Sequence, residues 1–241
     1  MPRPHRAVFP GVPHHVTQRG NHRERVFHAA GDPEAYLDLL HAYARRLGLA
    51  IHAYCLMPNH VHLVVTPSTL ESMHRTLQAV HSQFAQRVNR MRAVVGHLWQ
   101  GRYHASALDA NHFLNAVRYV ERNPVEASLV TRAEDYQWSS AAGHCGMRTD
   151  PLIEPASSTN VLRGIADWSS WLSLGVPDDC RKLLRRNERR GLPCGSESFV
   201  EQLGRIAGRD LRYHPHGGRR KIKEIKGSDP STNMKGSDPS V

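Results

Sequence analysis

The feature that most constrains the fold is a pair of β-type segments separated by a three-residue turn. Residues 49–56 are apolar enough for a buried strand, and Met57-Pro58-Asn59 interrupts that strand as a turn. In residues 60–66, valine and leucine alternate with histidine, which is the pattern of a strand with two different faces. A connection this short joins antiparallel neighbours. We therefore expect a β-hairpin at the centre of the fold.

One strand and one helix are predicted ahead of the hairpin. Residues 14–19 read as the strand. Asp32 is the expected N-cap of the helix, with Pro33 in its first turn, and Gly48 ends the helix as a C-cap.

Behind the hairpin the sequence predicts two helices around a fourth strand. Ser68 and Glu71 form a capping-box pattern ahead of a long helix. Its apolar residues recur at gaps of three and four: Leu70, Met73, Leu77, Val80, Phe84, Val88 and Met91. Residues 103–108 predict the strand, and residues 113–122 predict a helix that Pro124 terminates.

The order β-α-β-β-α-β, followed by a helix, is the split βαβ or ferredoxin-like pattern. We expect an α+β fold, in which helices cover one face of a four-stranded antiparallel sheet, with a small helical C-terminal extension. The expected parts are a first domain at 1–147, a linker at 148–160, a small basic helical region at 161–213 and a disordered basic tail at 214–241. In the third part, helices are predicted at 168–187 and 196–206.

The charge balance favours an anionic polymer as partner. The chain has 32 Lys and Arg against 22 Asp and Glu, a formal charge of +10, and each phosphate that is neutralised releases counterions. The first 25 residues contain no apolar run typical of a signal peptide, and no segment is long enough for a membrane span. Four cysteines form no C-x-x-C pair. We expect a cytoplasmic, nucleoid-associated protein with free thiols and no membrane partner.

The sharpest candidate for chemistry is the pair His60 and His62. Alternate residues of a strand point to the same face, so these two imidazoles can converge on one metal ion. An H-x-H pair is weak evidence in a chain with 17 histidines, and a solvated strand face is the alternative.

The helix at 113–122 adds a second candidate. Tyr119 lies about 200° round the helix from Val117 and therefore away from the centre of the apolar stripe. Asn123 is four residues further on and shares that side. A surface tyrosine is the alternative for Tyr119 alone. Together with the histidine pair, however, a phenol beside a divalent cation can attack a phosphodiester and form a phosphotyrosine.

Other catalytic patterns are weaker. The chain has no G-x-x-x-x-G-K, G-x-S-x-G or H-E-x-x-H motif. Cys145 follows His144, but sequence neighbours rarely form a Cys–His dyad.

Four separate motifs resemble those of the single-tyrosine HUH transposases, over roughly residues 8–145. The motifs are residues 15–21 (HVTQRGN), 57–63 (MPNHVHL), 98–103 (LWQGRY) and 119–125 (YVERNPV). More narrowly, they resemble the REP-associated tyrosine transposases (RAYT). Residues 191–200 also resemble a longer RAYT form.

This resemblance implies roles for individual residues. Tyr119 matches the nucleophile that takes the 5′ phosphate, His60 and His62 match the metal ligands, and Asn123 matches a third polar ligand. The family's metal is Mg²⁺ or Mn²⁺, and its substrates are DNA hairpins cleaved as single strands. Insertion-sequence members are dimers that exchange tyrosine helices, whereas RAYT-like members can be monomers, so a homodimer and a monomer are both open here.

The function predicted is metal-dependent nicking and rejoining of single-stranded DNA at REP-like hairpins. Phosphate contacts are expected from Arg19, Asn21 and Arg102. Unpaired bases are expected to stack on Trp99 or Tyr103, with core packing the alternative for both rings. Two other functions stay open: a hairpin DNA- or RNA-binding protein whose catalysis has decayed, and a metallohydrolase that uses the H-x-H pair without Tyr119.

Overall fold

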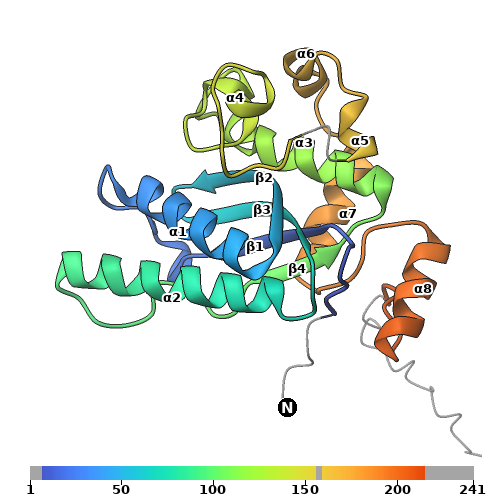
Figure 1. The fold of residues 1–241 in the computed structure, drawn as a ribbon, viewed down its shortest axis with the longest axis horizontal. Coiled ribbons are helices and arrows are strands. Elements are labelled where there is room, and N and C mark those ends of the chain that lie inside the picture. Colours follow the sequence, from blue (N-terminus) through green and yellow to red (C-terminus); the bar gives the residue numbers. More distant parts are fainter. Residues whose placement is uncertain (1–6, 156–158, 215–241) are drawn as a thin grey trace, which may run out of the picture.

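A computed structural model describes residues 7–155 and 159–214. Four strands form one antiparallel sheet in the order β2-β3-β1-β4 (Figure 1). They are β1 (His14–Arg19), β2 (Leu49–Met57), β3 (His60–Pro67) and β4 (His104–Ala107). The predicted hairpin is β2–β3, and the α+β fold with a four-stranded antiparallel sheet is confirmed.

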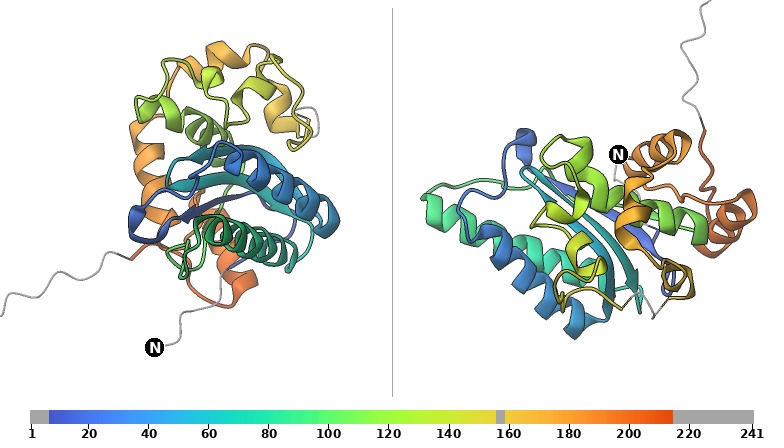
Figure 2. Two further views of the ribbon diagram at one scale, coloured as in Figure 1. Left: turned by 90° about the vertical axis from the view of Figure 1, so that its left-hand side faces the viewer. Right: turned by 90° about the horizontal axis from the view of Figure 1, so that it is seen from above.

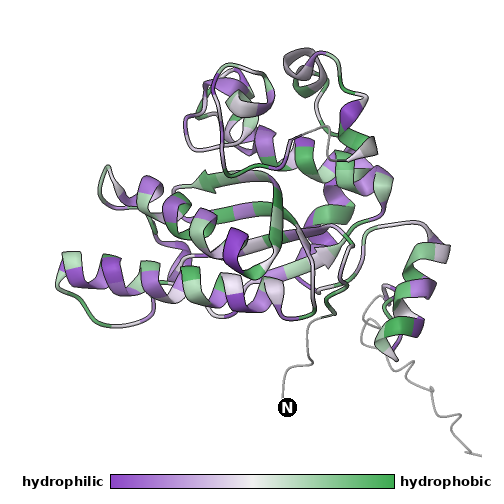
Figure 3. Cartoon of the chain, in the orientation of Figure 1, coloured by the Kyte–Doolittle hydropathy of each residue, from purple (hydrophilic) through white to green (hydrophobic). Residues whose placement is uncertain are grey.

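Two helices cover one face of the sheet. They are α1 (Asp32–Leu47) and α2 (Ser72–Arg92), which pack on each other and on the central strands (Figure 2). The strands of the sheet carry much of the hydrophobic colouring in Figure 3. The shared core is apolar and buried. Its members include Val16, Val61, Leu63, Leu40 and Phe84.

The third helix, α3 (Ala110–Glu126), packs on the opposite face of the sheet. The expectation of helices on one face therefore holds for α1 and α2 but not for α3. The reason is a second apolar surface on the sheet, which includes Ala53, Cys55 and Val64 and buries the Phe113, Val117 and Val120 stripe of α3.

Several helix ends differ from those expected. Asp32 lies inside α1, and its carboxylate accepts bonds from the backbone nitrogens of His28 and Ala29. Glu71 makes no side-chain cap for α2; instead Thr69 and Ser72 exchange side-chain-to-backbone bonds. Because α2 begins at Ser72, Leu70 of the predicted stripe lies ahead of the helix and is solvent-exposed. Met91, in the last turn of the helix, is solvent-exposed as well.

Pro124 does not terminate α3, which continues to Glu126. Asp109 is the N-cap of the helix, and its side chain accepts a bond from the backbone nitrogen of His112. The extra turn carries Asn123 and Pro124 into the packed part of the helix, where both are buried.

The C-terminal region contains short helices. They are α4 (Ala141–His144), α5 (Asn160–Arg163), α6 (Trp168–Ser173), α7 (Asp178–Glu188) and α8 (Glu197–Ala207), with 3-10 turns η1 (Asn21–Arg23) and η2 (Ala133–Asp135) earlier in the chain. The single helix predicted at 168–187 is divided into α6 and α7. Gly175, at φ +75°, and Pro177 lie at the break.

One helix of the C-terminal region packs on the sheet. Helix α7 packs against β1, β4 and α3 (Figure 1). After α7, Cys194 pairs with the end of β4, where its backbone nitrogen donates to the Ala107 carbonyl. In the segment predicted as a linker, Leu152 is buried in the core beneath α1 and α2. The predicted tail, apart from His214, lies outside the described residues.

Gly48 confirms the predicted C-cap of α1, with φ +68°. A Cβ added there would lie 2.2 Å from the Ser68 hydroxyl oxygen. We expect Gly48→Ala to lower the free energy of unfolding by about 1–2 kcal/mol, measured by urea denaturation. Gly31→Ala is the matched control, because no atom lies within 4 Å of its added Cβ and its φ is negative. Equal effects of the two substitutions would contradict this explanation.

Candidate active site and metal centre

The predicted histidine pair lies on the sheet face that α3 covers. His60 pairs with Arg19 and His62 with Thr17, so a polar row from two strands faces α3. The alternate side chains Val61 and Leu63 enter the core on the other face. The imidazole rings of His60 and His62 are 4.8 Å apart between centroids.

Tyr119 lies on this same face. Its ring packs edge-on against His62 and against His15, with centroid separations of 5.7 Å in both cases. The side chain is 5% exposed, so it is not the surface tyrosine that the helix pattern alone would allow. One chain therefore brings the candidate nucleophile to the candidate metal ligands.

His15 is a site residue that the sequence did not identify as one. Its Nε2 lies 3.0 Å from Nδ1 of His62, and the two rings are stacked with only 4° between their planes. The period of two in His15, Thr17 and Arg19 was the available signal, because it places all three on one face of β1. If His62 donates the proton in this bond, its Nε2 keeps a free lone pair, the form that binds a metal ion.

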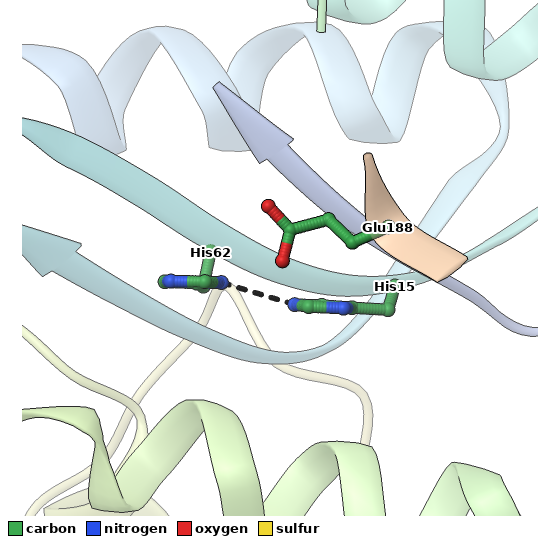
Figure 4. Close-up of side chains that lie close together, drawn as sticks. All are labelled: His15, His62 and Glu188. Carbon is green, nitrogen blue, oxygen red and sulfur yellow. Dashed lines mark hydrogen bonds between the residues drawn. The ribbon is translucent and has the colours of Figure 1, made fainter. Parts of the chain in front are cut away.

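Glu188, near the end of α7, completes a three-residue cluster (Figure 4). Its carboxylate accepts a 2.6 Å hydrogen bond from the Thr17 hydroxyl. Ligand atoms of His15, His62 and Glu188 all lie within 4.8 Å of one another. No local motif predicts this residue, because it is 126 positions away from His62 in the sequence and reaches the site only through the packing of α7.

The donor set fits a divalent cation. Two imidazoles and a carboxylate are ligands that transition metals accept, and Nδ1 of His15 is buried without a hydrogen-bond partner in the structure. This cluster is compatible with the use of a divalent metal. His62 belongs to both the predicted pair and the observed cluster, so it is the common element of any such site.

Burial keeps the site histidines neutral. It lowers the pKa of His62 and of His15, and it lowers the pKa of His60 to about 4, with help from the positive charge of Arg19. Neutral imidazole is the metal-binding form. Burial also raises the pKa of Tyr119, whereas a hydrogen bond from Arg185 opposes that rise.

These shifts predict how the stability of the metal-free protein depends on pH. Burial lowers the pKa of His14, His52 and His60 to about 4, but histidine in the unfolded chain titrates near about 6.5. Above that pH, burial of these neutral histidines causes no loss of stability. As the pH drops from there toward 4, the unfolded chain binds more protons, and the free energy of unfolding should fall by about 1.4 kcal/mol per pH unit for each histidine. Urea denaturation across this range measures the decline. His52→Gln should make it less steep, and an unchanged slope would contradict the assignment.

Asn123 is 9% exposed, and its amide nitrogen donates a 2.8 Å bond to the backbone carbonyl of Tyr119. This bond fixes the amide and leaves its oxygen as the atom that can act as a ligand. Tyr119 and Asn123 thus lie one turn apart on the same side of α3, as predicted.

Glu121, between these two residues, anchors α3 from its other side. It is fully buried and accepts bonds from Ser140, from Nδ1 of His144 at 2.6 Å and from the Trp168 indole at 2.8 Å. Nδ1 of His144 is therefore bonded to Glu121 and not to the Cys145 thiol. Burial also raises the pKa of Cys145 to about 12, which disfavours the thiolate. The structure therefore does not support a Cys145–His144 dyad.

Three loops converge at the His60 end of the sheet. The backbone nitrogen of Gly20 donates to Asn59, and that of Asn21 donates to Leu98. Arg19 is half-buried beside His60, and Arg102 is exposed in the loop that leads to β4. The predicted DNA-contact residues Arg19, Asn21 and Arg102 are thus placed around one end of the site.

Trp99 and Tyr103 both take part in core packing, the alternative weighed for each ring. Tyr103 is 6% exposed and belongs to the core beneath α1 and α2. Trp99 is half-buried against that core, with its ring near Tyr36, His81 and Phe84, and its indole nitrogen donates to the His81 carbonyl. Base stacking on these rings stays a prediction.

Residues 10–123 match the model of the family described as IS200-like transposases. The matched part contains β1, the histidine pair, Tyr119 and Asn123. Over these residues the chain is similar to the IS200-like transposases.

Two solved structures are similar to the chain. A REP-associated tyrosine transposase bound to a REP hairpin is 18% identical, with a TM-score of 0.52, over 64% of this chain and 92% of that one. A candidate transposase from Deinococcus radiodurans is 19% identical, with a TM-score of 0.34, over 54% of this chain and 92% of that one. The first likeness supports the fold. No curated protein matches the chain, and no helix among residues 7–155 and 159–214 is long and apolar enough to cross a membrane.

Proposed function

We propose that the protein nicks and rejoins single-stranded DNA at hairpin sequences of the REP type, with Tyr119 as nucleophile. The observation that carries this proposal is the edge-on packing of the buried Tyr119 ring on His62 and His15, within one chain. A tyrosine placed by core packing alone would not need a polar, histidine-lined surface beneath it. The likeness to a protein whose structure holds a REP hairpin supports the choice of substrate.

In the proposed reaction, the Tyr119 phenolic oxygen attacks phosphorus and the bond from phosphorus to the 3′ oxygen breaks. The phenol releases its proton to solvent, and the departing 3′ oxygen takes one up. The 5′ phosphate stays on Tyr119, so a later attack by a 3′ hydroxyl can rejoin the strand. Arg19, Asn21 and Arg102 hold the phosphates on either side.

We assign the metal site to His60, His62 and Asn123, with Mg²⁺ or Mn²⁺ as the ion. A bound divalent cation supplies Lewis-acid polarisation and a template for the phosphodiester. Beside these residues, His15 fixes the ring orientation of His62 through their 3.0 Å bond. Tyr119 contacts the histidines of its own chain, which supports a site formed within one chain.

The direct test is capture of the covalent intermediate. The full chain is incubated with a hairpin oligonucleotide that carries a single-stranded foot, with Mn²⁺, Mg²⁺ or a chelator. We expect an adduct that survives denaturation, forms with either metal but not with chelator, and maps to the Tyr119 peptide by mass spectrometry. A fully paired duplex of the same sequence is the control substrate. Hairpin binding without an adduct under any of these conditions would instead support the decayed binding protein.

A further inference from the structure

A cationic side chain beside the Tyr119 hydroxyl comes from neither the histidine face nor α3. Nε of Arg185, on α7, lies 3.4 Å from the Tyr119 oxygen, and its guanidinium carbon lies 5.9 Å from the centre of the ring. The family model ends at residue 123, so this contact comes from a part of the chain that the model does not cover.

The position of Arg185 is fixed by its helix. On either side of it, Leu184 is fully buried in the core beneath α3, and Asn187 is 3% exposed and donates a bond to the Pro193 carbonyl. One turn earlier, Arg181 pairs with Glu126 of α3 at 3.0 Å. Helix α7 is therefore attached to the tyrosine helix itself and to the segment that pairs with β4, so the Arg185 side chain starts from a rigid base.

Several charges near Tyr119 affect how easily its oxygen can carry a negative charge. Glu188 of α7 faces the tyrosine and disfavours negative charge on its oxygen, whereas Arg19 of β1 and Arg185 favour it. His15 and His62, which touch the ring, are held neutral by burial. Of these groups, Arg185 donates a hydrogen bond to the oxygen, and a guanidinium has further N–H donors that can reach a phosphate.

We infer that Arg185 is a further catalytic residue of this site, which holds the Tyr119 oxygen and stabilises the negative charge that develops on it and on the phosphodiester during attack. This inference rests on the proposed function. Stabilisation of developing charge by a positioned donor is a large effect in enzymes, and loss of one such donor costs about 10²-fold or more in rate.

The experiment compares Arg185→Ala and Arg185→Lys with Lys182→Ala, which removes an exposed cation from the same helix. Single-turnover cleavage of the hairpin oligonucleotide is measured as a function of pH. We expect about 10²-fold slower cleavage for Arg185→Ala, with the rising limb of the pH profile moved to higher pH, and partial recovery for Arg185→Lys. Hairpin affinity and thermal stability should match those of Lys182→Ala. A rate and profile like those of Lys182→Ala, or a faster rate, would overturn the inference.

The two proposals fail in different ways. Adduct formation by the unmodified protein tests the proposed function, and the rate of Arg185→Ala compared with Lys182→Ala tests the role of Arg185. If the unmodified protein forms no adduct, the proposed function fails. If it forms the adduct and Arg185→Ala cleaves as fast as Lys182→Ala, the role of Arg185 alone is refuted.

Discussion

Tyr119→Phe should abolish both the covalent adduct and strand cleavage, with a loss of about 10³-fold or more in the single-turnover rate. The substitution removes one oxygen from a ring that packs edge-on against two imidazoles, so the packing and the fold should survive. The affinity for the hairpin should change little, because the ring itself remains. The rate is measured with a 5′-labelled oligonucleotide, and the affinity by fluorescence anisotropy.

Tyr43→Phe is the matched control, since it removes a phenolic oxygen from α1, on the far side of the sheet. It should cleave at the unmodified rate. Cleavage that persists in Tyr119→Phe would favour the metallohydrolase that uses the histidine pair without a tyrosine. Loss of cleavage in both variants would point to a general effect on folding and would contradict the specific role of Tyr119.

His62→Asn should remove both metal-dependent cleavage and metal-dependent stabilisation. His62 is the residue that the predicted pair and the observed cluster share, so its loss affects either donor set. We expect an increase in melting temperature on addition of Mn²⁺ for the unmodified protein, because a ligand that binds only the folded state stabilises it. In His62→Asn that increase should disappear, and cleavage should fall by about 10²-fold or more.

His74→Asn is the control, because His74 is exposed on α2, away from the site. Two further substitutions distinguish the donor sets. Loss of the Mn²⁺ effect in His60→Asn but not in Glu188→Gln supports the predicted pair, and the reverse result supports the cluster of His15, His62 and Glu188. An undiminished Mn²⁺ effect in His62→Asn would refute a metal site at this face.

Local patterns explain why much of the fold could be predicted. Alternation along β3 predicts which side chains share a face. In a strand that is paired on both sides, successive side chains point to opposite faces of the sheet. The left-handed cap at Gly48 follows from the chemistry of glycine. The prediction that Pro124 terminates the helix is wrong. A proline removes one helix hydrogen bond, and burial of the last turn of α3 offsets that loss.

The sequence predicts site residues where a local pattern marks them. The H-x-H pair marks His60 and His62, and the helix pattern marks Tyr119; the structure brings all three to one face of the sheet. No local pattern marks Glu188 and Arg185, because their place depends on how α7 packs on β1, β4 and α3. The amphipathic pattern of α7 indicates the face that carries Leu184, but it does not indicate which neighbouring charges will lie beside Tyr119.

The attachment of Glu121 has a consequence for how the helix that carries Tyr119 can move. If α3 shifted by itself, a buried carboxylate would lose its three hydrogen-bond donors, and an uncompensated charge of this kind costs about 3–5 kcal/mol. The donors Ser140, His144 and Trp168 all follow α3 in the chain. A displacement of α3 that keeps these bonds therefore has to carry that downstream segment with it.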